Sequence, residues 1–77
     1  MKEVKITTES IRVDQFLKWT GIAATGGRAK EMIISGLVKV NGEEETRRSR
    51  QIAPGDTVEV EGHGCFRVVS GKVRGGT

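Results

Sequence analysis

The sequence predicts an α+β domain, with two short helices packed on a small, mostly antiparallel sheet. Apolar residues recur at helical spacing in two segments, 13–20 and 29–36, and alternate with polar residues in several others. Each helical segment meets a glycine, a residue that commonly ends helices. The chain has 77 residues, of which 35% are hydrophobic, so it has room for one domain with a small core.

The first strand is expected over residues 2–7, where polar and apolar residues alternate and Val4 and Ile6 share one face. The first helix follows Ser10 and ends at Gly21. Its inward stripe consists of Val13, Phe16, Leu17 and Thr20. This one-sided stripe indicates that the helix buries a single face against the sheet.

The second helix is expected to begin at Thr25, because a threonine hydroxyl accepts a hydrogen bond from a free backbone N–H at a helix start. It ends at Gly36, which tolerates a left-handed backbone conformation. Its inward stripe consists of Ala29, Met32, Ile33 and Gly36. The two helices therefore share one amphipathic pattern and face the same core.

The second half of the chain is expected to supply the rest of the sheet, with strands at 37–40, 43–46, 57–61 and 65–69. Asn41-Gly42 is a strong hairpin signal, and Pro54-Gly55 marks a second turn. Residues 47–51 are polar and are expected to form a loop. The glycine-rich, basic tail 70–77 is expected to fray. We see a single domain over residues 1–77, with its core at about residues 10–60.

The start of the second helix has the features of an anion site. Free N–H groups and the helix dipole favour a negative charge there, and Gly26 and Gly27 leave the backbone open to a phosphate. Arg28 and Lys30 add positive charge where it disfavours an isolated helix. A bound phosphate would compensate that cost. The alternative is a flexible glycine connector beside a solubilising arginine.

A second basic cluster occupies Arg47, Arg48 and Arg50. The segment extends the same positive face if it lies beside Lys39 and the second helix, and each phosphate it neutralised would steepen the salt dependence of binding. The alternative is a solvated loop whose arginines pair with the glutamates at 43–45, as surface pairs that contribute little stability.

The residues suited to catalysis or metal binding are few. Cys65 and His63 are the only soft metal ligands, too few for a closed zinc site, and no paired carboxylates or nucleophile–base set stand out. A single cysteine suits a reducing, cytoplasmic setting, and no apolar run has membrane-spanning length. We expect no enzyme activity, cofactor, metal, membrane partner or small-molecule substrate. Phe16 and Phe66 are expected in the core, and packing is favoured over base stacking for Trp19.

Residues 10–60 resemble the S4 RNA-binding domain, specifically its small stand-alone branch of YaaA-type and YbcJ-type proteins. Arg12-Val13-Asp14 resembles the family's opening of the first helix, and Gly55-Asp56 its approach to the last strand. Further positions match at the family's mutual spacing, namely Ala29, Gly36, Val38, Val40, Asn41 and Gly42. Thr25 stands at the family's serine position, whereas Gly26 stands where the family carries an arginine that Arg28 would have to replace.

The resemblance implies an S4-like (alpha-L) fold and non-catalytic binding of structured RNA, often ribosomal or transfer RNA, with the helix pair docked on the RNA backbone. A ribosome or another ribonucleoprotein is the implied larger partner. The expected RNA-binding residues are Arg12, Gln15, Lys18, Thr25, Gly26, Gly27, Arg28, Lys30, Lys39, Asn41, Arg47, Arg48 and Arg50. The residues alone leave two alternatives open, a DNA-binding helix-turn-helix-like module and a protein-interaction adapter on a ribonucleoprotein.

Overall fold

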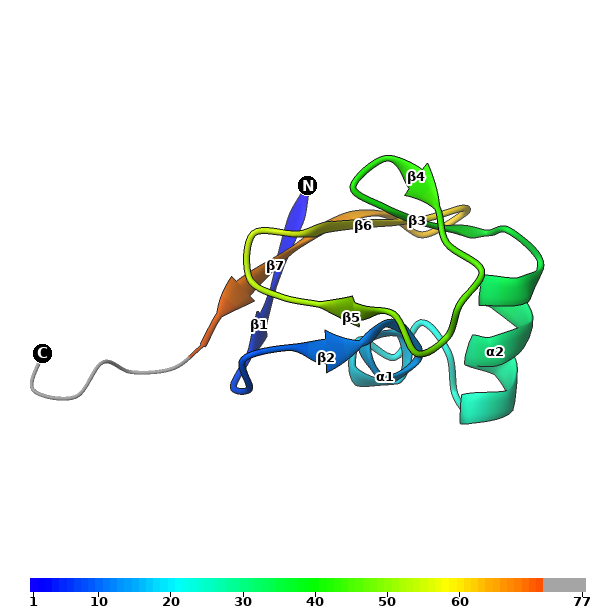
Figure 1. Ribbon diagram of the computed structural model, residues 1–77, viewed down its shortest axis with the longest axis horizontal. Coiled ribbons are helices and arrows are strands. Elements are labelled where there is room, and N and C mark those ends of the chain that lie inside the picture. The colour runs from blue at the N-terminus through cyan, green and yellow to red at the C-terminus, as the bar shows by residue number, and fades with distance from the viewer. Residues whose placement is uncertain (72–77) are drawn as a thin grey trace, which may run out of the picture.

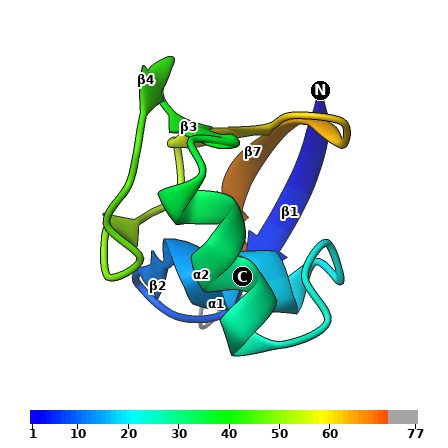
Figure 2. The ribbon, with the colours of Figure 1, turned by 90° about the vertical axis from the view of Figure 1, so that its right-hand side faces the viewer.

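The structure, a computed structural model, describes residues 1–71 and places two helices against one face of a sheet (Figures 1 and 2). The helices are α1 (Val13–Trp19) and α2 (Gly26–Ile34). The strands are β1 (Lys2–Ile6), β2 (Ile11–Arg12), β3 (Val38–Val40), β4 (Glu43–Glu44), β5 (Gln51–Ile52), β6 (Thr57–Val60) and β7 (Gly64–Ser70). Both predicted helices are therefore confirmed, and so is the α+β class.

Five of the strands form one mixed sheet with the order β1-β7-β6-β3-β4. The outer pair β1 and β7 runs parallel, and the other neighbours run antiparallel. Strands β2 and β5 form a separate two-residue ladder, in which Ile11 faces Ile52 and Arg12 faces Gln51. The expectation of a small, mostly antiparallel sheet is confirmed.

The core lies between the inner face of the sheet and the two helices. Residues at alternate positions of β3, β6 and β7 are buried, and so are the predicted apolar positions of the helix stripes, of which Phe16 and Ile33 are fully buried. Phe16 of α1 meets Phe66 of β7 edge to face, with ring centroids 6.3 Å apart. Each strand therefore turns one face to the helices and the other to solvent.

Three residues with left-handed backbone conformations shape the end of α2 and the turn of the hairpin. Gly36 ends α2 with φ +80°, a conformation that a side chain would strain. Asn41 and Gly42 have φ +52° and +84° in the turn between β3 and β4, as the Asn-Gly signal predicts. These backbone conformations fix where the chain leaves α2 and where it reverses after β3.

Three sequence predictions are wrong in detail. The return strand β4 ends at Glu44 instead of Thr46, and Gln51 belongs to β5 instead of a loop, because it pairs with β2. Ser70 ends β7, and the Gly71 N–H donates to the Ile6 carbonyl at 2.7 Å, so these two residues are held by β1 and are not frayed. The rest of the predicted tail, 72–77, lies outside the described residues. No helix within residues 1–71 is long and apolar enough to span a membrane.

Candidate nucleic-acid interface

The basic segment 47–50 is bound to the start of α1 by its own backbone. The N-cap residue of α1, Arg12, makes no side-chain cap, and the free N–H groups at the helix start find carbonyls instead. The Val13 N–H donates to the Arg50 carbonyl at 2.9 Å, and the Asp14 N–H donates to the Arg48 carbonyl at 3.3 Å. A segment far away in the sequence therefore supplies the helix cap, which places its arginines beside the first turn of α1.

Arg12 is held in a fixed orientation by the adjacent carboxylate of Asp14. Its Nε and Nη2 donate to the two carboxylate oxygens at 3.1 and 2.7 Å, a bidentate pair. Asp14 also accepts the Gln15 N–H at 2.8 Å and is buried, so it cannot swing away. The Arg12 side chain stays 44% exposed, and its Nη1 group makes no hydrogen bond to any other residue in the range 1–71.

Glu45 holds side chains of the basic segment from a buried position. One carboxylate oxygen accepts the backbone N–H and the Nε of Arg47 at 3.0 and 3.2 Å, and the other accepts Nη1 of Arg50 at 3.0 Å. Its side chain is 9% exposed. The side-chain and backbone hydrogen bonds from Arg47, with help from Arg50, outweigh desolvation and lower the pKa of Glu45 from 4.5 to about 2. Glu45 therefore stays ionised and clamps two arginines at physiological pH.

The start of α2 has the geometry that its sequence predicts. The Thr25 hydroxyl accepts the Arg28 N–H at 3.1 Å, so Thr25 is the N-cap. A side chain at Gly26 would meet nothing within 4 Å, and one at Gly27 would meet only the Thr25 hydroxyl at 3.9 Å, so this surface is open. Among the described residues, Arg28 forms a single ion pair, an exposed contact of 3.6 Å with Glu31.

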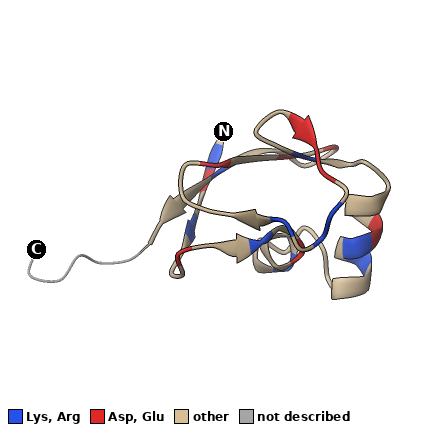
Figure 3. Ribbon diagram, viewed as in Figure 1, with Lys and Arg blue, Asp and Glu red and all other residues tan. Residues whose placement is uncertain are grey.

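These parts lie at one end of the molecule, as Figure 3 shows by the blue segments around α2, the start of α1 and the basic segment. Helices α1 and α2 pack directly against each other. The seven basic residues there are Arg12, Lys18, Arg28, Lys30, Arg47, Arg48 and Arg50. Asp14, Glu31 and Glu45 in this region are each paired with an arginine. Glu44 lies beside Gly36, just after α2. Basic residues still outnumber acidic ones here, so this end carries a local excess of positive charge.

Lys39 and Asn41, two of the expected RNA-binding residues, differ from the others in their surroundings. Lys39 alternates with the buried residues of β3, so it lies on the sheet face opposite the helices, and its cross-strand neighbours are Glu44 and Glu59. The condition under which the basic segment would extend a positive face that includes Lys39 is therefore not met. The Asn41 side chain is engaged inside the domain, because its nitrogen donates to Asp56 at 3.1 Å and its oxygen accepts the Thr57 N–H at 2.9 Å.

The sequence did not predict that Glu45 is buried, and it favoured packing for Trp19, which is exposed. Glu45 follows two exposed glutamates, and no local signal separates its buried carboxylate from theirs. Trp19 is 60% exposed at the end of α1, although packing was favoured for it. Its position two residues after the buried Leu17, off the inward stripe, was the available signal.

Comparison with known proteins identifies the family. The S4 domain model matches residues 4–69 of this chain. The chain belongs to the S4 domain family. The matched range includes both helices and the parts of all seven strands that lie within it.

Two relatives resemble this S4 domain over most of its length. The "Probable ribosome maturation protein RlbA" of Bacillus subtilis (strain 168) is 43% identical over 67 residues, which cover 87% of this chain and 94% of that protein. The "Putative RNA-binding protein YbcJ" of Escherichia coli (strain K12) is 40% identical over 53 residues, which cover 69% of this chain and 76% of that protein. The resemblance to a small stand-alone branch is confirmed.

Proposed function

We propose that this S4 domain is a non-catalytic RNA-binding protein that binds structured RNA, ribosomal or transfer RNA, through phosphate contacts. The contacts come from the start of α2 and from the basic segment 47–50. One observation carries the proposal: the backbone of that segment caps α1, which gathers the charges of distant segments at the helix-bearing end. The names of the two relatives, one concerned with ribosome maturation and one with RNA binding, support RNA as the ligand.

The charges at this end divide into fixed and free groups. Arg12, Arg47 and Arg50 are oriented by buried carboxylates, which limits the entropy lost when they meet a phosphate. Lys30 and Arg48 form no ion pair among residues 1–71 and remain free to approach the RNA. Fixed groups suit the recognition of backbone shape, and free groups add the sequence-independent attraction of phosphates.

A salt titration with matched arginine variants tests the proposal. We expect the wild-type protein to bind a labelled RNA hairpin at about 50 mM salt and to lose affinity steeply toward about 200 mM. Arg48→Ala removes one phosphate contact, so the slope of log K against log salt falls by about 0.7–0.9 and the affinity falls with it. Arg67→Ala removes an exposed arginine from the opposite sheet face and is the control.

Five results contradict the proposal. If the protein does not bind RNA at low salt, or if its affinity does not change with salt concentration, the contacts are not made to phosphates. If Arg48→Ala and Arg67→Ala reduce the affinity for RNA equally, the interface does not lie at the helix-bearing end. Displacement of the RNA by duplex DNA at equal concentration favours the helix-turn-helix alternative, and an association that survives nuclease treatment favours the protein adapter.

A further inference from the structure

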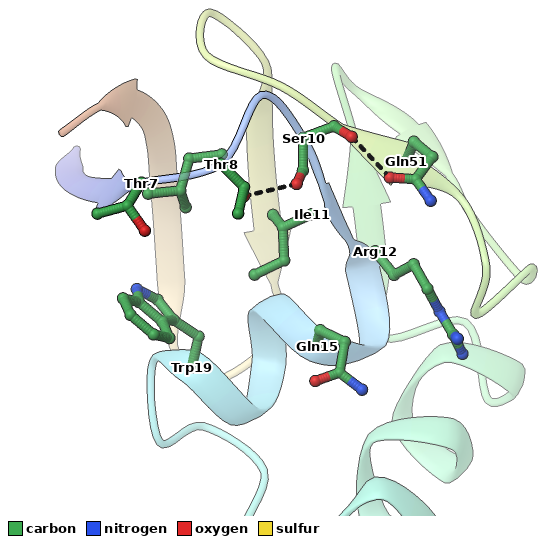
Figure 4. A pocket seen from close by; sticks show the side chains of 9 residues that line it. Thr7, Thr8, Ser10, Ile11, Arg12, Gln15, Trp19 and Gln51 are labelled. Atoms are coloured by element: carbon green, nitrogen blue, oxygen red, sulfur yellow. Dashed lines mark hydrogen bonds between the residues drawn. The ribbon is translucent and has the colours of Figure 1, made fainter. Parts of the chain in front are cut away.

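An open pocket of about 350 Å³ lies between the exposed side of α1 and the segment that joins β1 to β2 (Figure 4). Its volume is at the lower end of the range for small-ligand sites, about 300–1,000 Å³. Trp19 stands at one side, Ile11 forms an apolar centre, and Gln15, Arg12 and Gln51 lie toward the other side. No acidic residue lines it.

Trp19 gives the pocket a fixed aromatic wall. The indole Nε1–H donates to the Lys5 carbonyl at 3.2 Å, which satisfies the one polar group of the ring and ties it to β1. The side chain is nevertheless 60% exposed. An exposed indole whose orientation is already set offers a stacking surface at little entropic cost.

The rim supplies hydrogen-bonding groups beside that wall. Ser10 donates to the Gln51 side-chain oxygen at 2.9 Å, and Thr8 donates to the Ser10 carbonyl at 2.7 Å, so this side of the rim is braced. The Thr7 hydroxyl and the Gln15 side-chain amide have no hydrogen-bond partner within residues 1–71. A hydroxyl and an amide together offer both donors and acceptors to the edge of a planar heterocycle.

The pocket is continuous with the basic helix-bearing end. Arg12 and Gln15 line it, and with Lys18 and Trp19 they form the exposed stripe of α1 at helical spacing. Lys18 forms no ion pair within residues 1–71, and Arg12 keeps its Nη1 group free. A ligand that suits this pocket has a planar, hydrogen-bonding part for the cavity and a negative charge for its edge, which are the parts of a nucleotide.

We propose that this pocket takes one unpaired nucleobase of the bound RNA, stacked on Trp19, with the adjoining phosphate beside Lys18 and Arg12. The inference rests on the proposed function and adds to it a preference for RNA that presents an unpaired nucleotide. Sequence-specific readers of RNA commonly stack unpaired bases on aromatic side chains in this way. Stacking one base contributes on the order of 5- to 150-fold in affinity.

Three RNA hairpins with the same stem test the pocket: one fully paired, one with a single bulged nucleotide and one with an abasic bulge. We expect the wild-type protein to bind the bulged hairpin about 5- to 150-fold more tightly than the other two. Trp19 is the only tryptophan in the chain, so its fluorescence reports stacking directly, and we expect quenching by the bulged hairpin alone.

Two variants and one control separate stacking from folding. Trp19→Ala is expected to reduce binding of the bulged hairpin to the level of the paired one, and Trp19→Phe to retain part of the preference. Ile34→Ala removes another exposed apolar side chain, 58% exposed on α2, and should leave the preference intact. Retained binding of the paired hairpin and an unchanged circular dichroism spectrum show that Trp19→Ala remains folded.

The outcomes distinguish the pocket from the proposed function. Equal affinity for all three hairpins with unchanged Trp19 emission overturns the pocket while RNA binding stands. A Trp19→Ala variant that keeps the full preference for the bulged hairpin also overturns it. If no hairpin binds at all, the proposed function fails and the pocket assignment fails with it.

Discussion

Replacing Glu45 by glutamine removes the negative charge that holds Arg47 and Arg50 in the basic segment. A pKa of about 2 instead of 4.5 corresponds to about 3 kcal/mol of stabilisation of the ionised form. Arg47 is 72% exposed, and screening by solvent there reduces the figure. We therefore expect Glu45→Gln to lower the free energy of unfolding by about 1.5–2 kcal/mol at pH 7.

The effect has a defined pH dependence. Because the pKa of Glu45 in the folded state lies below its unfolded value, the stabilisation is fully present above about pH 5 and is lost as the pH falls toward about 2. The difference between the wild-type protein and Glu45→Gln should therefore shrink through this window. Urea unfolding followed by Trp19 fluorescence at pH 7, 4 and 2.5 measures it.

The control for this prediction is Glu43→Gln, which removes an exposed glutamate two residues away that forms no ion pair within residues 1–71. We expect it to change stability by less than about 0.5 kcal/mol at any of these pH values. The reasoning is refuted if Glu45→Gln is as stable as the wild-type protein at pH 7. A difference that stays constant down to pH 2.5 refutes it as well, because the lost interaction would then not depend on the carboxylate charge.

Further predictions concern the two ends of α2, the hairpin turn and the outer face of the sheet. Gly26→Ala should raise the free energy of urea unfolding by about 0.5 kcal/mol, because its Cβ enters open space in a helix. Gly36→Ala should lower it by more than about 1 kcal/mol, because φ is +80° and the Cβ meets the Glu44 carboxylate at 3.1–3.3 Å. Asn41→Ala should cost about 1–2 kcal/mol through its lost hydrogen bonds, measured in the same way. Lys39→Ala should leave the affinity for an RNA hairpin unchanged, and a clear loss of affinity would return Lys39 to the interface.

Much of the fold follows from local spacing in the chain. The stripes of α1 and α2, the glycine that ends α2 and the Thr25 cap are all visible in the sequence because each depends on residues within a few positions of one another. The Asn41-Gly42 turn is equally local. Even the outward direction of Lys39 was available, since alternation in Val38-Lys39-Val40 puts its side chain opposite the buried valines.

The candidate interface was predictable only in part. The sequence indicated which residues carry positive charge, but it did not indicate that Glu45 is buried among exposed glutamates. It also did not show that the β2–β5 ladder and the carbonyls of Arg48 and Arg50 hold this part of the chain against β2 and the start of α1. These backbone contacts join residues that are 34 to 41 positions apart, and they depend on backbone hydrogen bonds that no residue type encodes by itself.

The sequence by itself determined the α+β class, the two helices with the Thr25 cap of α2, and membership of the S4 domain family, because periodicity and turn chemistry act over short stretches of chain. Only the tertiary structure decided which charges share a surface and that Trp19 forms one wall of a pocket. The physical reason is that the free N–H groups of α1 required acceptors, and the basic segment provided them. Because these N–H groups at the start of α1 bind carbonyls of the basic segment, the arginines of that segment lie beside the helix pair.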